Sequence, residues 1–311
     1  MGMVEAVPGH RGMWLVWVRA VRVFTFTASV VPVLVGAAMA ARVDGPVAWW
    51  LLPFVVVASV LMHAGTNLIN DCFDYLKGID TDDYSYGGSG VIVQKLLTPR
   101  QAFIGALVTF AASCGIGLLF IAVRGWPIFA LGVVGLLGGF FYTARPVGYK
   151  YFALGDALVF TLMGPLMVIG SHFVLTGSYN HAVLIASLPV GCLVAAILHA
   201  NNMRDIQHDR EAQVRTVANL LGHDRARFEY YGLVGGAYVA ALGMIAGGLI
   251  GPWGLLVLLT VPLAARNIRR VARSQPQQPE SIATLDVQTA QLHLVFGLLF
   301  ALAILLGELL R

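Results

Sequence analysis

Nine long apolar runs follow one another along the chain, and a helix needs about 20 such residues to cross a bilayer. Continuous runs favour membrane helices, because the strands of a membrane barrel are short and alternate between apolar and polar residues. The composition agrees, since 58% of the residues are hydrophobic and only 12% are charged, unlike a soluble domain. We therefore predict an all-α, multi-pass membrane protein with about nine transmembrane helices. The expected spans are Val23–Ala41, Val47–Asn67, Gln101–Val123, Pro127–Thr143, Ala153–Thr176, His181–Ala200, Phe228–Ile250, Trp253–Val271 and Thr289–Glu308.

The basic residues indicate how these spans are oriented. The chain has 20 Lys and Arg residues, and all except Arg42, Arg124 and Arg311 fall on one side of a nine-span arrangement. Lys and Arg accumulate in the loops on the cytoplasmic side of a membrane. We therefore expect a multi-pass protein of the cell membrane whose amino terminus and long loops face the cytoplasm. The same topology explains the net charge of +4 without a nucleic-acid partner.

Two acidic motifs follow two of the apolar runs, both on the expected cytoplasmic side. Side chains three or four positions apart share a face of a helix, so each motif presents a row of carboxylate and amide groups. The first motif consists of Asn67, Asp71 and Asp74, and the second of Asn201, Asp205 and Asp209. A solvated loop charge is a simpler explanation for residues such as Asp82 and Asp83, which lie outside these rows.

Rows of carboxylates beside basic residues suit a divalent cation and a diphosphate. Mg²⁺ prefers oxygen ligands and leaves positions for phosphate oxygens, while basic side chains neutralise the remaining phosphate charge. We predict that Asp71, Asp74, Asp205 and Asp209 are catalytic and bind Mg²⁺ together with Asn67 and Asn201. The candidate diphosphate-binding residues are Arg22, Lys77, Lys95, Arg145, Lys150, Arg204 and Arg215. Anchoring of the membrane topology is the alternative role for each of these basic residues.

Aromatic residues are concentrated in residues 140–151, beside Arg145 and Lys150. Aromatic faces stabilise cations, which would suit a carbocation intermediate, and an interfacial aromatic belt is the alternative. The candidate contacts of the organic substrates are Tyr142, Tyr151, Asn70 and Asn202. The histidines within or beside spans share no common spacing, so hydrogen bonds in helix packing are their expected role; they are His63, His172, His199 and His293.

The two acidic motifs also suggest an internal repeat. The first ends the second span and the other ends the sixth, four spans later. We predict a single membrane domain over residues 1–311, built from two pseudo-repeated four-helix units, about 12–176 and 181–311, with one extra helix. Rotation of one unit onto the other about the membrane normal would bring the two acidic ends face to face.

At these motifs the chain resembles the UbiA superfamily of intramembrane aromatic prenyltransferases. The resemblance covers nearly the whole chain, through residues 17–22, 67–80, 88–91, 141–156 and 201–222. Within the superfamily, residues 155–165, 170–171 and 176–177 are most similar to the branch that acts on 1,4-dihydroxy-2-naphthoate.

The resemblance implies a helical bundle around a large cavity that is open to lipid. It implies a Mg²⁺-dependent enzyme that transfers a polyprenyl group from polyprenyl diphosphate to the naphthoate. Diphosphate and CO₂ would be released, giving demethylmenaquinol for menaquinone biosynthesis. The partners would therefore be the polyprenyl diphosphate, the dihydroxynaphthoate and the lipid bilayer.

The sequence departs from the superfamily pattern at two places. Val23 follows Arg22 where the superfamily usually has proline, and residues 213–216 read Gln-Val-Arg-Thr in place of Gly-Lys-x-Thr. Arg215 is the candidate replacement for the missing lysine.

Two alternative functions have to be weighed. A sister enzyme would use another aromatic acceptor, such as 4-hydroxybenzoate, since the acceptor pocket cannot be recognised in the sequence. An ion-coupled transporter would also carry paired carboxylates, but transporter sites lie near the bilayer midplane on broken helices. Here the carboxylates follow almost a full span of apolar residues, which places them at the membrane surface.

Overall fold

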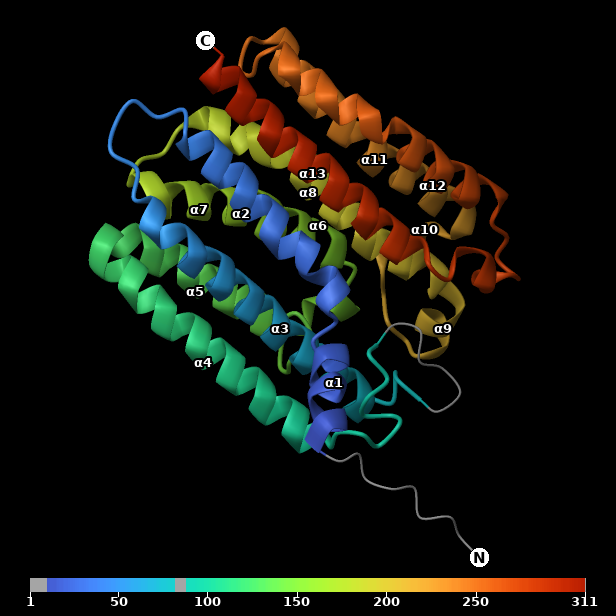
Figure 1. The fold of residues 1–311 in the computed structure, drawn as a ribbon. Helices are drawn as coiled ribbons and strands as arrows, with labels where there is room; N and C mark the ends of the chain where they lie inside the picture. Colours follow the sequence, from blue (N-terminus) through green and yellow to red (C-terminus); the bar gives the residue numbers. More distant parts are fainter. Residues whose placement is uncertain (1–9, 82–87, 311) are drawn as a thin grey trace, which may run out of the picture.

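The computed structural model describes residues 10–81 and 88–310, and these residues fold into a bundle of long helices (Figure 1). Asp82 and Asp83 lie outside the described residues. The helices are α1 (His10–Ala20), α2 (Thr27–Ala40), α3 (Leu52–Leu76), α4 (Pro99–Arg124), α5 (Trp126–Phe140), α6 (Gly155–Thr161), α7 (Met167–Thr176), α8 (His181–Arg204), α9 (Ile206–Glu211), α10 (Val217–Leu221), α11 (His223–Ala246), α12 (Val261–Arg273) and α13 (Leu285–Leu309). The predicted all-α class is confirmed.

Among the described residues, seven helical segments are long and apolar enough to cross a membrane: Val23–Ala40, Trp49–Leu76, Pro99–Arg124, Gly155–Thr176, His181–Arg204, His223–Ala246 and Pro279–Leu309. They correspond to seven of the nine expected spans. The expected fourth span is the 15-residue helix α5, which is short for a crossing. The expected eighth span begins as a 3₁₀ helix, Pro252–Thr260, and ends in α12, whose last turns carry several arginines. The number nine therefore stays a prediction.

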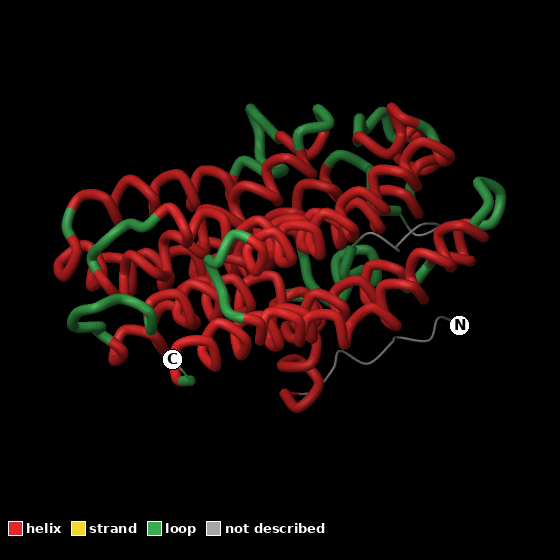
Figure 2. The backbone as a smooth tube through the Cα atoms, turned by 90° about the horizontal axis from the view of Figure 1, so that it is seen from above, coloured by secondary structure: helices red, strands yellow, loops and turns green. Residues whose placement is uncertain are grey.

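The helices run side by side, with the connecting loops at their ends (Figure 2). Helix α3 packs on α4, α8 packs on α11, and α13 contacts both α2 and α8. One large hydrophobic core joins α2, α8, α11 and α13, whereas two smaller cores lie around α3 and α4. The two four-helix units predicted from the acidic repeat stay a prediction.

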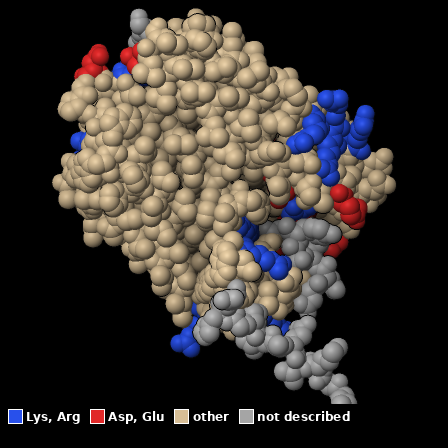
Figure 3. All heavy atoms as spheres, viewed as in Figure 1, with Lys and Arg blue, Asp and Glu red and all other residues tan. Residues whose placement is uncertain are grey.

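Basic side chains gather toward one end of the bundle. Figure 3 shows most of the visible Lys and Arg side chains on the side that carries α9, α10 and the end of α12, away from the carboxyl terminus. This distribution matches the segregation of basic residues on which the predicted cytoplasmic orientation depends.

The first expected span is interrupted at its start, and this break positions a basic side chain. Arg22 has a left-handed backbone with φ of 54°, and a 3₁₀ turn, Val23–Phe26, separates it from α2. The amide nitrogen of Asn67 on α3 donates to the Val21 carbonyl at 2.8 Å and to the Thr25 hydroxyl at 3.1 Å. Helix α3 thus holds the break in place and keeps Arg22 beside the first acidic motif.

The fifth expected span is also irregular. A π-helical segment, Leu162–Leu166, joins α6 to α7 and contains Pro165, which lacks the N–H that a regular helix uses there. Its Gly164 lies against α8 so closely that a Cβ atom at this position would be 2.6 Å from the Cα of Gly191. The two backbones can approach in this way because Gly164 has no side chain, and a Cβ atom at Gly191 would in turn be 3.1 Å from the Phe160 ring.

Three connecting segments meet at the end of the bundle where Arg22 lies. The segment after α5 pairs with the segment after α9, since the Ala153 N–H donates to the Arg215 carbonyl at 2.7 Å. The segment after α3 contacts α9 through His208 Nε2 and the Ile79 carbonyl oxygen, 2.8 Å apart. These contacts bring together the segments that follow the two acidic motifs.

Candidate active site

Asp71, on the last turns of α3, is buried and surrounded by groups from two other segments. Arg22 forms an ion pair with its carboxylate. The backbone N–H of Ser89 donates to Asp71 Oδ2 at 3.3 Å, and the Ser89 hydroxyl donates to the same oxygen. A Cβ atom at Gly88 would be 3.5 Å from Asp71 and 2.6 Å from Asp80, so the absence of a side chain lets this loop pass between the two carboxylates.

Asp74 lies one turn further along α3 and contacts the 3₁₀ turn Tyr149–Tyr151. Lys150 Nζ is 2.6 Å from Asp74 Oδ2, and the Tyr151 hydroxyl donates to Oδ1 at 2.7 Å. The side chain of Asn70 donates to the same carboxylate. Burial alone would lower the pKa of Lys150, but the charge of Asp74 raises it above its ordinary value. Lys150 therefore stays protonated beside the first motif.

The second motif lies where α8 ends, and the side chain of Arg204 contacts two of its members. Arg204 donates to both oxygens of Asp205, from Nε at 2.6 Å and from Nη2 at 2.8 Å. The same guanidinium donates to Asn201 Oδ1 at 2.5 Å and lies 3.3 Å from Asp286 of α13. Asp209 follows on α9, where the Thr216 hydroxyl donates to it at 3.5 Å.

The two motifs lie at the same cavity, which both Asn67 of the first and Asn201 of the second line. Burial raises the pKa of Asp209 to about 7; Lys150 opposes this, and the charges of Asp205 and Asp74 add to it. Asp74 is in the first motif and Asp205 in the second, so carboxylates from distant parts of the chain act on one group. Burial and the nearby Asp74 charge likewise raise the pKa of Asp80 to about 7.

This donor set fits Mg²⁺. It consists of buried carboxylates and amide oxygens, which are the hard oxygen ligands that Mg²⁺ prefers. Burial is the main cause of the raised pKa values of Asp80 and Asp209, and a divalent cation beside them would favour their ionised forms.

A cavity of about 1020 Å³ opens beside the first motif. Its polar end is lined by Arg22, Asn67, Asn70, Ser89, Lys150 and Asn201. The rest of its wall is largely apolar and includes Gly117, Gly132 and Gly170, where a Cβ atom would meet nothing within 4 Å. Tyr142 also lines it. Such a space accommodates an apolar chain whose polar head lies at the acidic motifs.

Other predicted diphosphate-binding residues lie at the margin of this site. Lys77 stacks on the Tyr151 ring, with its Nζ 3.2 Å from the ring centroid. Burial lowers the pKa of Lys77, and the charge of Arg145 contributes to this, so Arg145 lies nearby although its side chain is exposed. Lys95 and Arg215 are also exposed, and Arg215 contacts the residues after α5 through its backbone.

The structure adds two residues to the predicted site and shows one predicted residue in a different contact. Asn202, predicted to contact the substrates, donates to Asp156 at 3.2 Å. Ser89 and Asp80, which were not among the predicted site residues, lie beside Asp71. The sequence feature that could have indicated Ser89 is the run Gly88-Ser89-Gly90, because glycines beside a polar residue let the backbone approach another group closely.

The sequence profile of the UbiA prenyltransferase family matches residues 29–295. The chain belongs to this family. The predicted resemblance is thereby confirmed, and prenyl transfer is favoured over ion-coupled transport. The 1,4-dihydroxy-2-naphthoate octaprenyltransferase of Bacillus subtilis (strain 168) is 29% identical over 311 residues, covering 98% of this chain and 97% of that protein. Human UbiA prenyltransferase domain-containing protein 1 is 32% identical over 293 residues, covering 94% of this chain and 83% of that protein.

Solved structures share the UbiA fold. A digeranylgeranylglyceryl phosphate synthase superposes with a TM-score of 0.62 at 15% identity, over 96% of this chain and 100% of that one. A UbiA homolog from Archaeoglobus fulgidus bound to GPP and Mg²⁺ superposes with a TM-score of 0.60 at 14% identity, over 93% of this chain and 99% of that one. At these identities the likeness concerns the fold.

Proposed function

We propose that this protein transfers a polyprenyl group from polyprenyl diphosphate to 1,4-dihydroxy-2-naphthoate, releasing diphosphate and CO₂ and forming demethylmenaquinol. The observation that carries the proposal is that Asn67 and Asn201, one from each acidic motif, line the same large, mostly apolar cavity. The Bacillus subtilis relative, which is similar over nearly the full length of both chains, supports the naphthoate as acceptor.

The diphosphate would bind between the motifs through Mg²⁺ held by Asp71, Asp74, Asp205 and Asp209, with Asn67 and Asn201 beside them. The A. fulgidus homolog bound to GPP and Mg²⁺ supports this ligand pair. When bound, the cation stabilises the negative charge of the departing diphosphate. Arg22 and Lys150, which line the cavity and contact the first motif, would neutralise further phosphate charge.

The cavity would hold the isoprenoid chain and exclude water from the reacting carbon. Breaking the bond between the prenyl carbon and the diphosphate leaves an allylic cation, which the electron-rich naphthoate ring attacks. The ring then loses its carboxylate as CO₂. Tyr142 lies in the cavity wall, where its aromatic face would stabilise positive charge. Polar contacts at the polar end of the cavity and apolar contacts along the rest of its wall would therefore favour a polyprenyl diphosphate.

The reaction would take place at the cytoplasmic surface of the cell membrane. The apolar helices support a multi-pass membrane protein, and the basic residues at the end that carries the motifs support a cytoplasmic site.

An acceptor screen tests the proposal. Membranes containing the protein are offered one labelled polyprenyl diphosphate with either 1,4-dihydroxy-2-naphthoate or 4-hydroxybenzoate, each with Mg²⁺ or with EDTA. We expect Mg²⁺-dependent prenylation of the naphthoate, accompanied by CO₂ release. Prenylation of the benzoate alone would assign the protein to a sister enzyme, and product formation in EDTA would contradict the metal-dependent mechanism.

A further inference from the structure

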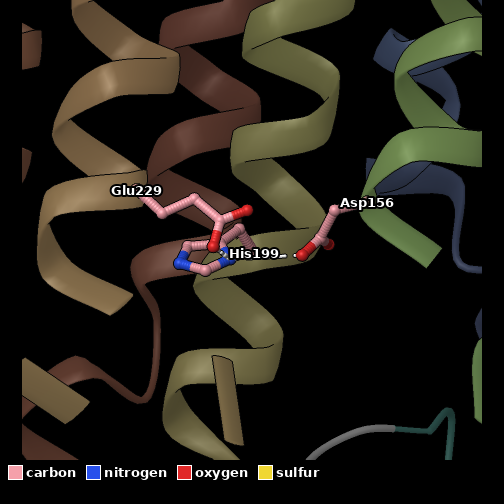
Figure 4. Close-up of side chains that lie close together, drawn as sticks. All are labelled: Asp156, His199 and Glu229. Atoms are coloured by element: carbon pink, nitrogen blue, oxygen red, sulfur yellow. Dashed lines mark hydrogen bonds and ion pairs between the residues drawn. The ribbon is translucent and has the colours of Figure 1, made fainter. Parts of the chain in front are cut away.

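A second group of ionisable side chains lies apart from the acidic motifs, between three helices. Asp156 of α6, His199 of α8 and Glu229 of α11 point toward one another (Figure 4). One potential ligand atom from each residue lies within 4.8 Å of the other two. His199 Nδ1 is 3.3 Å from Asp156 Oδ2 and 3.6 Å from Glu229 Oε2. The proposed prenyl transfer uses none of these three side chains.

The backbone determines how His199 is oriented. Its Nε2 lies 2.8 Å from the carbonyl oxygen of Ala226, and a carbonyl can only accept a hydrogen bond. Nε2 therefore carries a proton, and in the neutral imidazole Nδ1 presents its lone pair to the two carboxylates. This lone pair and the ionised carboxylates are all acceptors, so the arrangement requires a proton or a metal ion between them.

A proton on Nδ1 would supply only one positive charge for two carboxylates. His199 is fully buried and Asp156 is buried, and Glu229 Oε2 is enclosed without a hydrogen-bond partner. A divalent cation would balance both carboxylates and give the Glu229 oxygen a partner.

The geometry and the outer contacts match a transition-metal site. Ligands about 2.0–2.1 Å from a tetrahedral Zn²⁺ are separated from one another by about 3.3–3.4 Å, close to the two distances from Nδ1. A metal-binding histidine usually donates its other N–H to a backbone carbonyl, as His199 does to Ala226. Asp156 is held by the side chain of Asn202, which donates to its other oxygen at 3.2 Å.

We propose that Asp156, His199 and Glu229 bind a divalent transition-metal ion of the Zn²⁺ class, separate from the Mg²⁺ of the acidic motifs. The imidazole nitrogen favours such an ion over Mg²⁺, which prefers oxygen ligands. The Glu229 side chain is 24% exposed, which provides a route for the ion and for a water as fourth ligand. The ion would join α6, α8 and α11 next to the second motif, because His199 precedes Asp205 by less than two helical turns.

Zinc binding to the purified full-length chain in detergent tests this site. The protein is stripped with a chelator, saturated with Mg²⁺ to fill the oxygen-rich motifs, and equilibrated with Zn²⁺. Bound zinc is then measured by mass spectrometry after gel filtration. We expect one zinc ion per chain in the wild type, and affinity at least about tenfold weaker in His199→Gln and Glu229→Gln. His181→Gln, which alters an exposed histidine at the start of the same helix, should bind zinc as the wild type does.

Thermal unfolding of the same proteins provides a second measurement. Zn²⁺ should raise the Tm of the wild type and of His181→Gln more than that of Glu229→Gln, since only the former two retain the three ligands. Failure of the wild type to bind zinc would overturn the proposal even if the cluster variants did not fold. Equal zinc affinity in the wild type and both cluster variants would overturn it as well. Neither outcome bears on prenyl transfer, which the acceptor screen measures separately.

Discussion

The two acidic motifs contain the same residue types, but their basic partners come from different parts of the chain. In the first, Asp71 and Asp74 lie within helix α3 and receive their cations from elsewhere, from Arg22 before α2 and Lys150 after α5. In the second, α8 ends and Asp205 is paired with Arg204, the residue before it. The basic partners of the first motif thus come from distant parts of the chain, whereas Asp205 of the second also has an arginine next to it in the sequence. We expect the first motif to respond more strongly to changes in its basic partners.

The largest expected effect comes from removing one carboxylate charge from each motif. Asp71→Asn and Asp205→Asn should each lower kcat by about 10²–10³-fold, the effect of losing one preorganised electrostatic contact to a transition state. Prenyl transfer in membranes measures this, and gel filtration verifies that each variant is folded. Near-normal activity of Asp205→Asn would contradict a catalytic role for the second motif and leave it only a structural one.

Removing Lys150 tests the dependence of the first motif on distant cations. Lys150→Met leaves the buried carboxylate of Asp74 without its ion-pair partner, and breaking a buried pair costs about 3–5 kcal/mol. The Tm should fall, and Mg²⁺ should raise it more in this variant than in the wild type, because the metal would take over the lost charge.

Lys95→Met is the matched control, since Lys95 is exposed. Its Tm and its response to Mg²⁺ should equal those of the wild type. If Mg²⁺ shifted the Tm of Lys150→Met no more than that of the control, the metal would not bind at Asp74.

The pH dependence of stability offers a smaller effect. The pKa of Asp80 is raised from 3.8 to about 7 by burial and by the carboxylates of the first motif. A pKa raised in the folded state means that the stabilisation is complete below the unfolded value and is lost as the pH rises through about 7. Without Mg²⁺, the Tm should therefore decrease between pH 5 and pH 8.

Asp80→Asn isolates this contribution. The variant should show a weaker decrease of Tm over the same pH range, and added Mg²⁺ should weaken the decrease in the wild type. An unchanged pH profile in Asp80→Asn would show that Asp80 does not take up the proton.

The smallest expected effect concerns Arg215, the candidate replacement for the lysine that the family usually has. Its side chain is exposed, and exposed ion pairs contribute about 0.2–1 kcal/mol. Arg215→Ala should therefore raise KM for polyprenyl diphosphate by about two- to fivefold with little change in kcat. An unchanged KM would exclude a role for Arg215 in diphosphate binding.

The sequence was sufficient for the elements whose signal is local. Apolar runs identified the seven long membrane helices, and the spacing of three placed Asp71 and Asp74 within one helix, α3. The second motif is not carried by one helix, because α8 ends at Arg204, Asp205 caps it and Asp209 lies on α9. The fourth and eighth expected spans are less regular because α5 is short and because prolines and arginines interrupt the apolar character of residues 252–273.

Contacts between distant segments could not be predicted in this way. Lys150 and Lys95 look alike in the sequence, yet only Lys150 is carried to the first motif, by the 3₁₀ turn after α5. The left-handed backbone of Arg22 has no sequence signature, because glycine is the residue that usually adopts it. His199, expected to serve helix packing, lies between carboxylates supplied by two other helices, and no spacing within one helix reveals such a group.

The close contact between Gly164 and α8 has a consequence for substitutions at this glycine. Gly191 and Asp205 belong to the same rod-like element, 14 residues and about 21 Å apart. A single methyl group at Gly164 would meet the Gly191 backbone and push that rod sideways at its middle. The carboxyl end of α8, which Asp205 caps, would be displaced as well. Loss of turnover can thus originate from a position that touches neither substrate.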